Sequence, residues 1–134
     1  MTLVSKLVLI DSENNYLLMY RSEHPAFGND PDLPGGTGEL GEEPVQTCVR
    51  EVYEEIGVTI DESDLKQVYK GAEYSAHHTT YALFIARCDD RPDITMSWEH
   101  SRYEWLDKQD FIEKSKNSND TYMHMVAEVI GKLG

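Results

Sequence analysis

Residues 22–41 are crowded with Pro, Gly, Asp and Asn, and this stretch constrains the fold of the 134-residue chain more than any other feature. Such a composition opposes helices and long strands, so we expect a long loop with at most a short strand near Asp32 and Leu33. A loop of this length inside a compact domain usually carries function. The regular elements must therefore lie on either side of it.

The segments on either side of this loop follow strand and helix patterns. Residues 3–10 and 16–20 are rich in β-branched and other apolar residues and flank a polar turn, which predicts two strands. Later strands are predicted at 65–76, 79–88 and 103–106, followed by a brief helix from a cap at Asp107 through Ile112 and a last helix capped by Asn119 or Asp120. We expect one α/β domain over residues 1–134, a mixed sheet with helices packed against it.

The segment after the loop, residues 44–56, has the pattern of an amphipathic helix. Pro44 suits its first turn and Gly57 its end. At about 100° per residue, four apolar side chains share a stripe roughly 60° wide: Val45, Val49, Val52 and Ile56. Glu51 and Glu55 lie roughly 40° apart beside this stripe, so we expect them to meet at the edge of the core.

Two carboxylates at this spacing repel each other unless a cation lies between them. Hard oxygen ligands with no His or Cys close by favour Mg²⁺ or Mn²⁺ over zinc. Glu54 lies further round the helix, away from the core stripe. The helix alone also permits an ordinary solvated acidic face, so position by itself does not decide between the two interpretations.

The composition of the chain limits which binding partners and which cellular location we expect. A net charge of −13 argues against a nucleic-acid groove that depends on a general positive field, so nucleic acid is not an expected partner. The two cysteines, Cys48 and Cys88, suggest neither a disulfide framework nor a zinc site. Neither a membrane-spanning segment nor a signal peptide is recognisable, so we expect a cytoplasmic protein without membrane contact. The sequence leaves a homodimer open.

The stretch from Gly36 to Val58 resembles the Nudix box, whose pattern is Gly, five residues, Glu, seven residues, Arg-Glu-aliphatic-any-Glu-Glu-any-Gly-aliphatic. Every defined position of that pattern is met. The resemblance implies a Nudix-type α/β/α sandwich with a mixed β-sheet. It also implies Mg²⁺-dependent hydrolysis, with Mn²⁺ as a substitute, of a pyrophosphate bond in a nucleoside triphosphate, a sugar nucleotide or a dinucleoside polyphosphate.

The same resemblance assigns roles within and just before the box. Glu51 and Glu55 would be metal ligands, and the carbonyl of Gly35 would be an additional ligand. Glu54 would be a further ligand or the residue that orients or deprotonates the attacking water. Arg50 and Glu42 would form a structural ion pair that braces the loop against the helix.

Two residues outside the box complete the expected site. The stretch from Trp98 to Leu106 is similar to the Glu-His that precedes a Trp-ending strand in many Nudix hydrolases, which makes Glu99 a second candidate for the base. Arg21, after the second strand, could hold a substrate phosphate. An ordinary loop glutamate and a rim arginine are the alternatives, and the choice of base between Glu54 and Glu99 stays open.

The same sequence permits other interpretations. Residues 36–41 also satisfy G-x-G-x-x-G, but a Pro-rich loop precedes them and Glu42 and Glu43 would repel a pyrophosphate, so we reject a dinucleotide fingerprint. His24, Phe27 and the pair 77–78 could line a pocket, although ordinary loop positions are expected for the histidine pair. A nucleotide-sensing Nudix-like module that binds without turnover is the alternative function, and intact glutamates speak against it.

Overall fold

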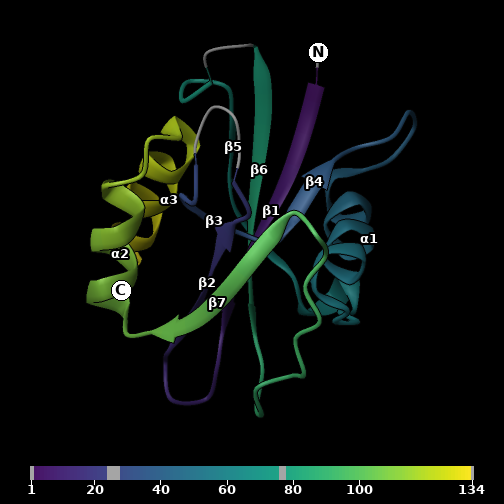
Figure 1. Ribbon diagram of the computed structural model, residues 1–134. Helices are drawn as coiled ribbons and strands as arrows, with labels where there is room; N and C mark the ends of the chain where they lie inside the picture. The colour runs from purple at the N-terminus through teal and green to yellow at the C-terminus, as the bar shows by residue number, and fades with distance from the viewer. Residues whose placement is uncertain (1, 24–27, 76–77, 134) are drawn as a thin grey trace.

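The computed structural model describes residues 2–23, 28–75 and 78–133. Its strands are β1 (Thr2–Ile10), β2 (Tyr16–Arg21), β3 (Pro31–Asp32), β4 (Gly35–Thr37), β5 (Lys66–Gly71), β6 (Thr79–Arg87) and β7 (His100–Leu106). Its helices are α1 (Pro44–Ile56), α2 (Lys108–Lys116) and α3 (Thr121–Lys132), with a short 3₁₀ turn at Glu62–Asp64. One mixed sheet lies between α1 on one side and α2 and α3 on the other, which confirms the α/β/α sandwich (Figure 1).

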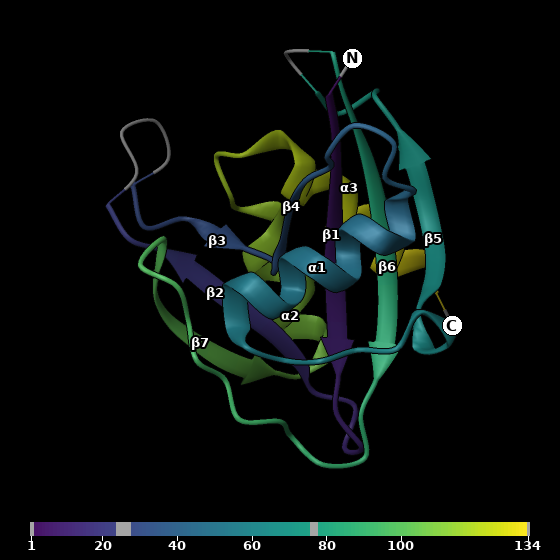
Figure 2. The ribbon, with the colours of Figure 1, turned by 90° about the vertical axis from the view of Figure 1, so that its right-hand side faces the viewer.

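Strand β1 lies at the centre of the sheet, and one of its edges is divided. Along the other edge it pairs in parallel with β6 over its whole length. On the divided edge, Ile10 pairs with Tyr16 of β2, whereas residues 4–6 pair with β4. Strand β2 diverges from β1 to pair with β3 and β7 (Figure 2). The sheet therefore forks between β1 and β2, and the loop after β2 fills the fork with β3 and β4.

The core has two layers because side chains alternate across each strand. On β1, Leu7 and Leu9 face α1, while Val8 and Ile10 face the two C-terminal helices. The α1 layer also contains buried side chains from the other central strands and the helix: Leu17, Met19, Phe84, Cys48, Val52 and Ile56. The opposite layer contains Tyr16, Leu18, Leu83, Phe111, Tyr122, Met123, Val126 and Ile130. Helix α1 is thereby fixed against β1 on the side of the fork.

Helix α1 has the predicted bounds because its end signals are local. Glu43 and Gln46 form a reciprocal capping box at its start, and Gly57 adopts φ 72° at its end. The predicted apolar face is rotated slightly in the structure. Cys48, Val52 and Ile56 are buried, whereas the expected core residues at 45 and 49 are only partly buried. Cys48 is thus a core residue.

Several predicted boundaries were wrong, for reasons of packing. Helix α2 runs to Lys116 rather than 112, because the buried side chains of Phe111 and Ser115 lie one turn apart. Strand β7 begins at His100 rather than 103, because β2 continues to pair with it through Arg21. Strand β5 ends at Gly71, five residues earlier than predicted, and the loop after β2 holds two short strands rather than at most one.

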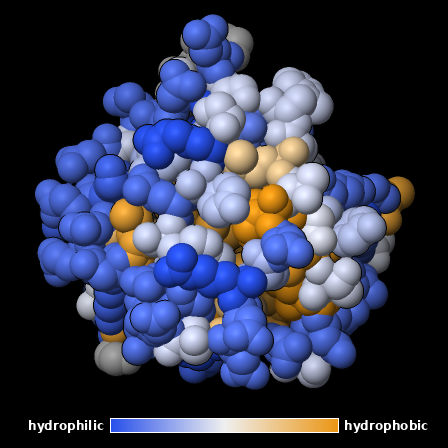
Figure 3. Space-filling model, turned by 60° about the horizontal axis from the view of Figure 1, so that its bottom comes forward, coloured by the Kyte–Doolittle hydropathy of each residue, from blue (hydrophilic) through white to orange (hydrophobic). Residues whose placement is uncertain are grey.

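Arg21 is the last residue of β2 rather than a residue beyond it, and Asp120 caps α3. His24, Phe27 and His77 lie outside the described residues. His78 has a φ of 56°. No helix in the described ranges is long and apolar enough to cross a membrane. The end of the molecule with the β1–β2 turn has a largely hydrophilic surface (Figure 3).

Gly35→Ala should destabilise the fold by about 2–4 kcal/mol, measured as the free energy of unfolding in urea. Gly35 has a φ of 142°, and a Cβ there would lie 2.0 Å from the backbone oxygen of Ser5, across the β1–β4 pair. Gly131→Ala is the matched control, since a Cβ there meets nothing within 4 Å. That helical substitution should stabilise by about 0.5–1 kcal/mol. Wild-type stability in Gly35→Ala would contradict the close pairing of β1 with β4.

Candidate active site

A cavity of about 390 Å³ opens at the fork of the sheet. It is lined by five of the predicted site residues, which come from distant parts of the chain: Arg21, Gly35, Glu51, Glu55 and Glu99. Glu54 is not among its lining residues. The fold therefore gathers most of the expected site around one hollow, with the glutamates of α1 on one wall.

Glu51 lies directly against the glycine backbone of β4. A Cβ at Gly36 would lie 2.3 Å from Glu51 Oε2. The carboxylate of Glu51 therefore occupies the space that a side chain at position 36 would need. Burial raises the pKa of Glu51, while the hydrogen bond that it accepts from Arg50 Nη1, at 3.0 Å, acts in the opposite direction. The like charges of Glu54 and Glu55 add to the increase.

Glu55, one turn further along α1, is buried and firmly held. Its Oε2 accepts a hydrogen bond from Ser97 Oγ at 2.8 Å and lies 3.5 Å from His100 Nδ1. Burial tends to raise its pKa, but the nearby imidazole of His100 and the hydrogen bond from Ser97 outweigh burial and leave the pKa below its ordinary value. Glu55 is therefore an ionised carboxylate at neutral pH, fixed in orientation before any ligand arrives.

Arg50 organises the acidic residues at the outer end of this wall. Its Nε donates to Glu42 Oε2 at 2.7 Å, which confirms the predicted ion pair between loop and helix. The hydrogen bond from Arg50 lowers the pKa of Glu42 to about 2. Arg50 Nη1 also lies 3.2 Å from Glu54, whose side chain is 55% exposed. Glu54 thus pairs with Arg50 at the surface instead of facing the cavity.

The acidic wall does not form a closed metal cage. Within residues 2–23, 28–75 and 78–133, no group of three or more His, Cys, Asp or Glu side chains is arranged to hold a metal ion. Glu51 and Glu55 with the carbonyl of Gly35 offer two carboxylates and one neutral oxygen. That donor set fits Mg²⁺, which keeps several waters and is commonly bound through one or two carboxylates plus substrate phosphates.

The opposite wall carries two cations around a buried carboxylate. Lys6 Nζ lies 3.1 Å from Asp32 Oδ1, and Arg21 Nη2 lies 3.4 Å from the same oxygen and 2.8 Å from Asp120. Lys6 is only 8% exposed and lines the cavity from β1. Lys6 was not predicted as a site residue, although one signal was present: it is the single charged residue in the strand-like segment of residues 3–10.

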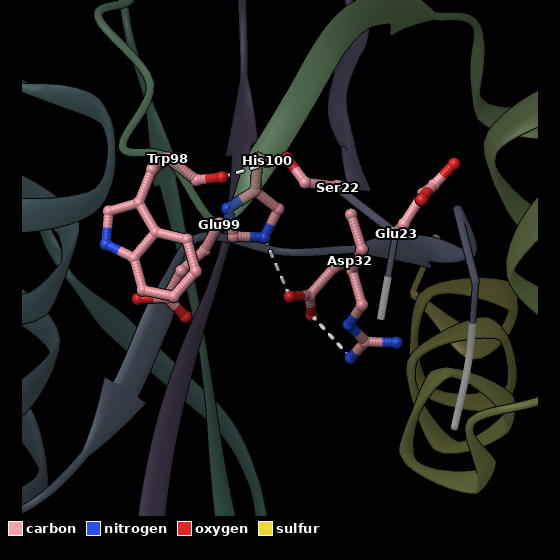
Figure 4. A pocket seen from close by; sticks show the side chains of 7 residues that line it. Ser22, Glu23, Asp32, Trp98, Glu99 and His100 are labelled. Carbon is pink, nitrogen blue, oxygen red and sulfur yellow. Dashed lines mark hydrogen bonds and ion pairs between the residues drawn. The ribbon is translucent and has the colours of Figure 1, made fainter. Parts of the chain in front are cut away.

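Asp32 joins this cationic wall to the glutamate wall. Its other oxygen lies 2.9 Å from His100 Nε2 (Figure 4). The Tyr122 hydroxyl donates to Asp32 as well. Burial alone would raise the pKa of Asp32, but the charge of Lys6 and the hydrogen bond from His100 hold it well below its usual value. Conversely, burial tends to lower the pKa of His100, while the hydrogen bond with Asp32 and the nearby carboxylate of Glu55 raise it to about 9.

Asp32→Asn should destabilise the protein by about 3–5 kcal/mol, because it leaves Lys6 and Arg21 buried beside a neutral amide of the same size. The free energy of unfolding in urea measures this effect. Glu128→Gln is the control, since Glu128 forms an exposed pair with Lys132 at 3.4 Å. That change should stay within about 0.5 kcal/mol. Equal losses in the two variants would mean that Asp32 does not hold the buried cations.

The chain is similar in sequence to known Nudix proteins. The NUDIX domain family matches residues 2–126. The 8-oxo-dGTP diphosphatase of Escherichia coli is 32% identical over 85 residues, which is 63% of this chain and 66% of that protein, just under two thirds of its length.

Solved structures agree in fold. The Ap4A hydrolase of C. elegans, in a binary complex, superposes with a TM-score of 0.74 at 19% identity, covering 96% of this chain and 93% of that chain. A bifunctional NMN adenylyltransferase/ADP ribose pyrophosphatase from Francisella tularensis, complexed with AMP and a manganese ion, gives 0.73 at 18% identity, covering 98% of this chain and 42% of that chain. The family match over nearly the whole sequence, together with this sandwich, shows that the chain belongs to the Nudix family.

Proposed function

We propose that this chain hydrolyses a phosphoanhydride bond in a nucleoside diphosphate derivative, with a divalent cation held by Glu51, Glu55 and the carbonyl of Gly35. One observation carries the proposal. The same cavity has a carboxylate wall on α1 and a wall containing Lys6 and Arg21. Carboxylates suit a metal ion and cations suit phosphate oxygens, so a metal diphosphate fits between them.

Mg²⁺ is the proposed ion and Mn²⁺ its substitute, because every available ligand is an oxygen. When bound, the cation would neutralise charge on the diphosphate and make the attacking water more acidic. The chain's own contribution is to orient the ligands. Ser97 and His100 hold the Glu55 carboxylate, and the backbone of Gly36 leaves room for the Glu51 carboxylate.

Lys6 and Arg21 would bind the phosphoryl oxygens on the other side. Asp32 keeps both cations in place before the substrate arrives, so little reorganisation is needed when it binds. Their charge also opposes the repulsion that a protein of net charge −13 exerts on an anion. The overall acidity is therefore compatible with a phosphate ligand at this one place.

Glu99 is the proposed general base. It lines the cavity, whereas Glu54 pairs with Arg50 at the surface. A base must reach the water that it deprotonates, so a carboxylate facing the reacting centre is better placed than one held outside it. Glu54 would act as a further ligand only after its contact with Arg50 is broken.

Nucleotides are the proposed substrates. Similar proteins are named for 8-oxo-dGTP, Ap4A, ADP ribose and dihydroneopterin triphosphate. Three of these four are nucleotides. All four contain an aromatic nitrogen heterocycle, either a nucleobase or a pterin, together with a phosphoanhydride. This shared chemistry supports a nucleoside triphosphate, dinucleoside polyphosphate or sugar nucleotide for this chain.

Glu55→Gln should lower kcat/KM by about 10²- to 10⁴-fold, because it removes one of two carboxylate ligands while keeping the side chain's shape. The assay is a nucleotide panel with Mg²⁺, read by mass spectrometry so that the cleaved bond is identified. Glu62→Gln, in the 3₁₀ turn, is the control and should keep wild-type rates. Undiminished turnover in Glu55→Gln or after chelation of Mg²⁺ would overturn the proposal, as would tight nucleotide binding with no turnover by the wild type.

Turnover at saturating Mg²⁺ should separate the two candidate bases. Glu99→Gln is expected to lower kcat by about 10²- to 10⁴-fold, because it removes the proposed proton acceptor. Glu54→Gln should lower kcat far less at saturating Mg²⁺, whatever its effect on metal affinity, because Glu54 lies outside the cavity. The assignment of Glu99 fails if kcat collapses with Glu54→Gln and persists with Glu99→Gln.

A further inference from the structure

We propose that Trp98 is the platform on which the aromatic base of the substrate stacks. The inference rests on the proposed function, since it places the base of the same nucleotide. It begins from a second cavity of about 330 Å³, which is lined in part by Trp98, Ser22 and Glu23. Arg21, Asp32 and Glu99 line both this cavity and the active-site cavity, so the two adjoin.

The arrangement of the second cavity suits a flat group. Figure 4 shows Trp98 and Glu99 on one side and Glu23 on the other, with His100 and Asp32 between them. Its floor therefore belongs to the buried charge network that also holds the cations of the active site. Because Arg21 borders both cavities, a phosphate bound at Arg21 would have its substituent next to this space.

The indole of Trp98 is 85% exposed, although Trp is among the side chains with most to gain from burial. Its backbone is nevertheless held tightly. Ser22 donates through Oγ to the carbonyl of Trp98 and through N–H to the carbonyl of Glu99, both at 2.9 Å. On the other side, Ser97 N–H donates to the carbonyl of Glu55 at 2.9 Å.

These contacts tie the Trp98 backbone to the end of β2, which carries Arg21, and to α1, which carries Glu51 and Glu55. The backbone that carries the indole is therefore fixed relative to the residues of the proposed reacting centre. A nucleobase is the occupant that fits this placement, because stacking on an indole needs no charge and tolerates any base. A peptide side chain from a partner protein would not need the adjoining cationic wall.

The test is calorimetric titration in Mg²⁺ buffer with α,β-methylene-ATP, which resists cleavage at the α–β bond, and with inorganic tripolyphosphate, which has no base. Trp98→Ala should weaken binding of the nucleotide analogue by about 5- to 100-fold and leave tripolyphosphate binding unchanged. Trp98→Phe should restore most of the affinity, because a phenyl ring still offers a stacking face. Tyr103→Ala, which removes an exposed aromatic ring of β7 outside both cavities, should bind both probes like the wild type.

The fluorescence of Trp98 gives a second readout, which would not change on nucleotide binding if Trp98 had a purely structural role. In a Trp105→Phe background, Trp98 is the remaining tryptophan. Its emission should be quenched by the nucleotide analogue and not by tripolyphosphate. Quenching by both probes to the same extent would overturn the inference.

The outcomes separate this inference from the proposed function. Equal affinity of wild type and Trp98→Ala for the nucleotide analogue overturns the stacking role even when hydrolysis is confirmed. Parallel weakening of nucleotide and tripolyphosphate binding also overturns it, because the indole would then act on the phosphate site. A wild type that binds the analogue through Trp98 but cleaves no nucleotide would refute the hydrolase and leave the stacking site standing.

Discussion

The buried carboxylate of Asp32 is the interaction on which the rest of this structure depends. It contacts Lys6 from β1, Arg21 from β2, His100 from β7 and Tyr122 from α3. Several cationic groups this close together in the interior would repel one another without a negative partner. The free-energy cost of removing them from water is offset only when the ion pairs have good geometry and additional hydrogen bonds. The carboxylate therefore connects four elements at the fork between β1 and β2.

The fork of the sheet explains why the site lies there. Because β1 pairs with β2 only at Ile10 and with β4 at residues 4–6, backbone and side chains must fill the space between them. Gly35 provides the close approach to β1, and the short strands around it place the loop between α1 and the cations. The result is a cavity with carboxylates on one wall and two cations on the other. The net charge of the chain does not reveal this separation.

Sequence patterns predicted local features well and distant contacts poorly. The bounds of α1, its glutamates and its pair between Arg50 and Glu42 follow from signals within a few turns of chain. Residue Asp32 was noted only as a position in a short strand, and Lys6 was not identified at all. Glu99 was reached through a resemblance between motifs, whereas the exposure of the neighbouring Trp98 was visible only in three dimensions.

By itself the sequence determined the family, the order of the longer strands and the helices, and the spacing that places Glu51 and Glu55 on one side of α1. Helical periodicity and capping act over a few residues, so these features are local. Only the tertiary structure decided which charges face the cavity. It brought Lys6 and Arg21 beside Asp32, since the pairing of buried charges depends on which elements meet across the sheet.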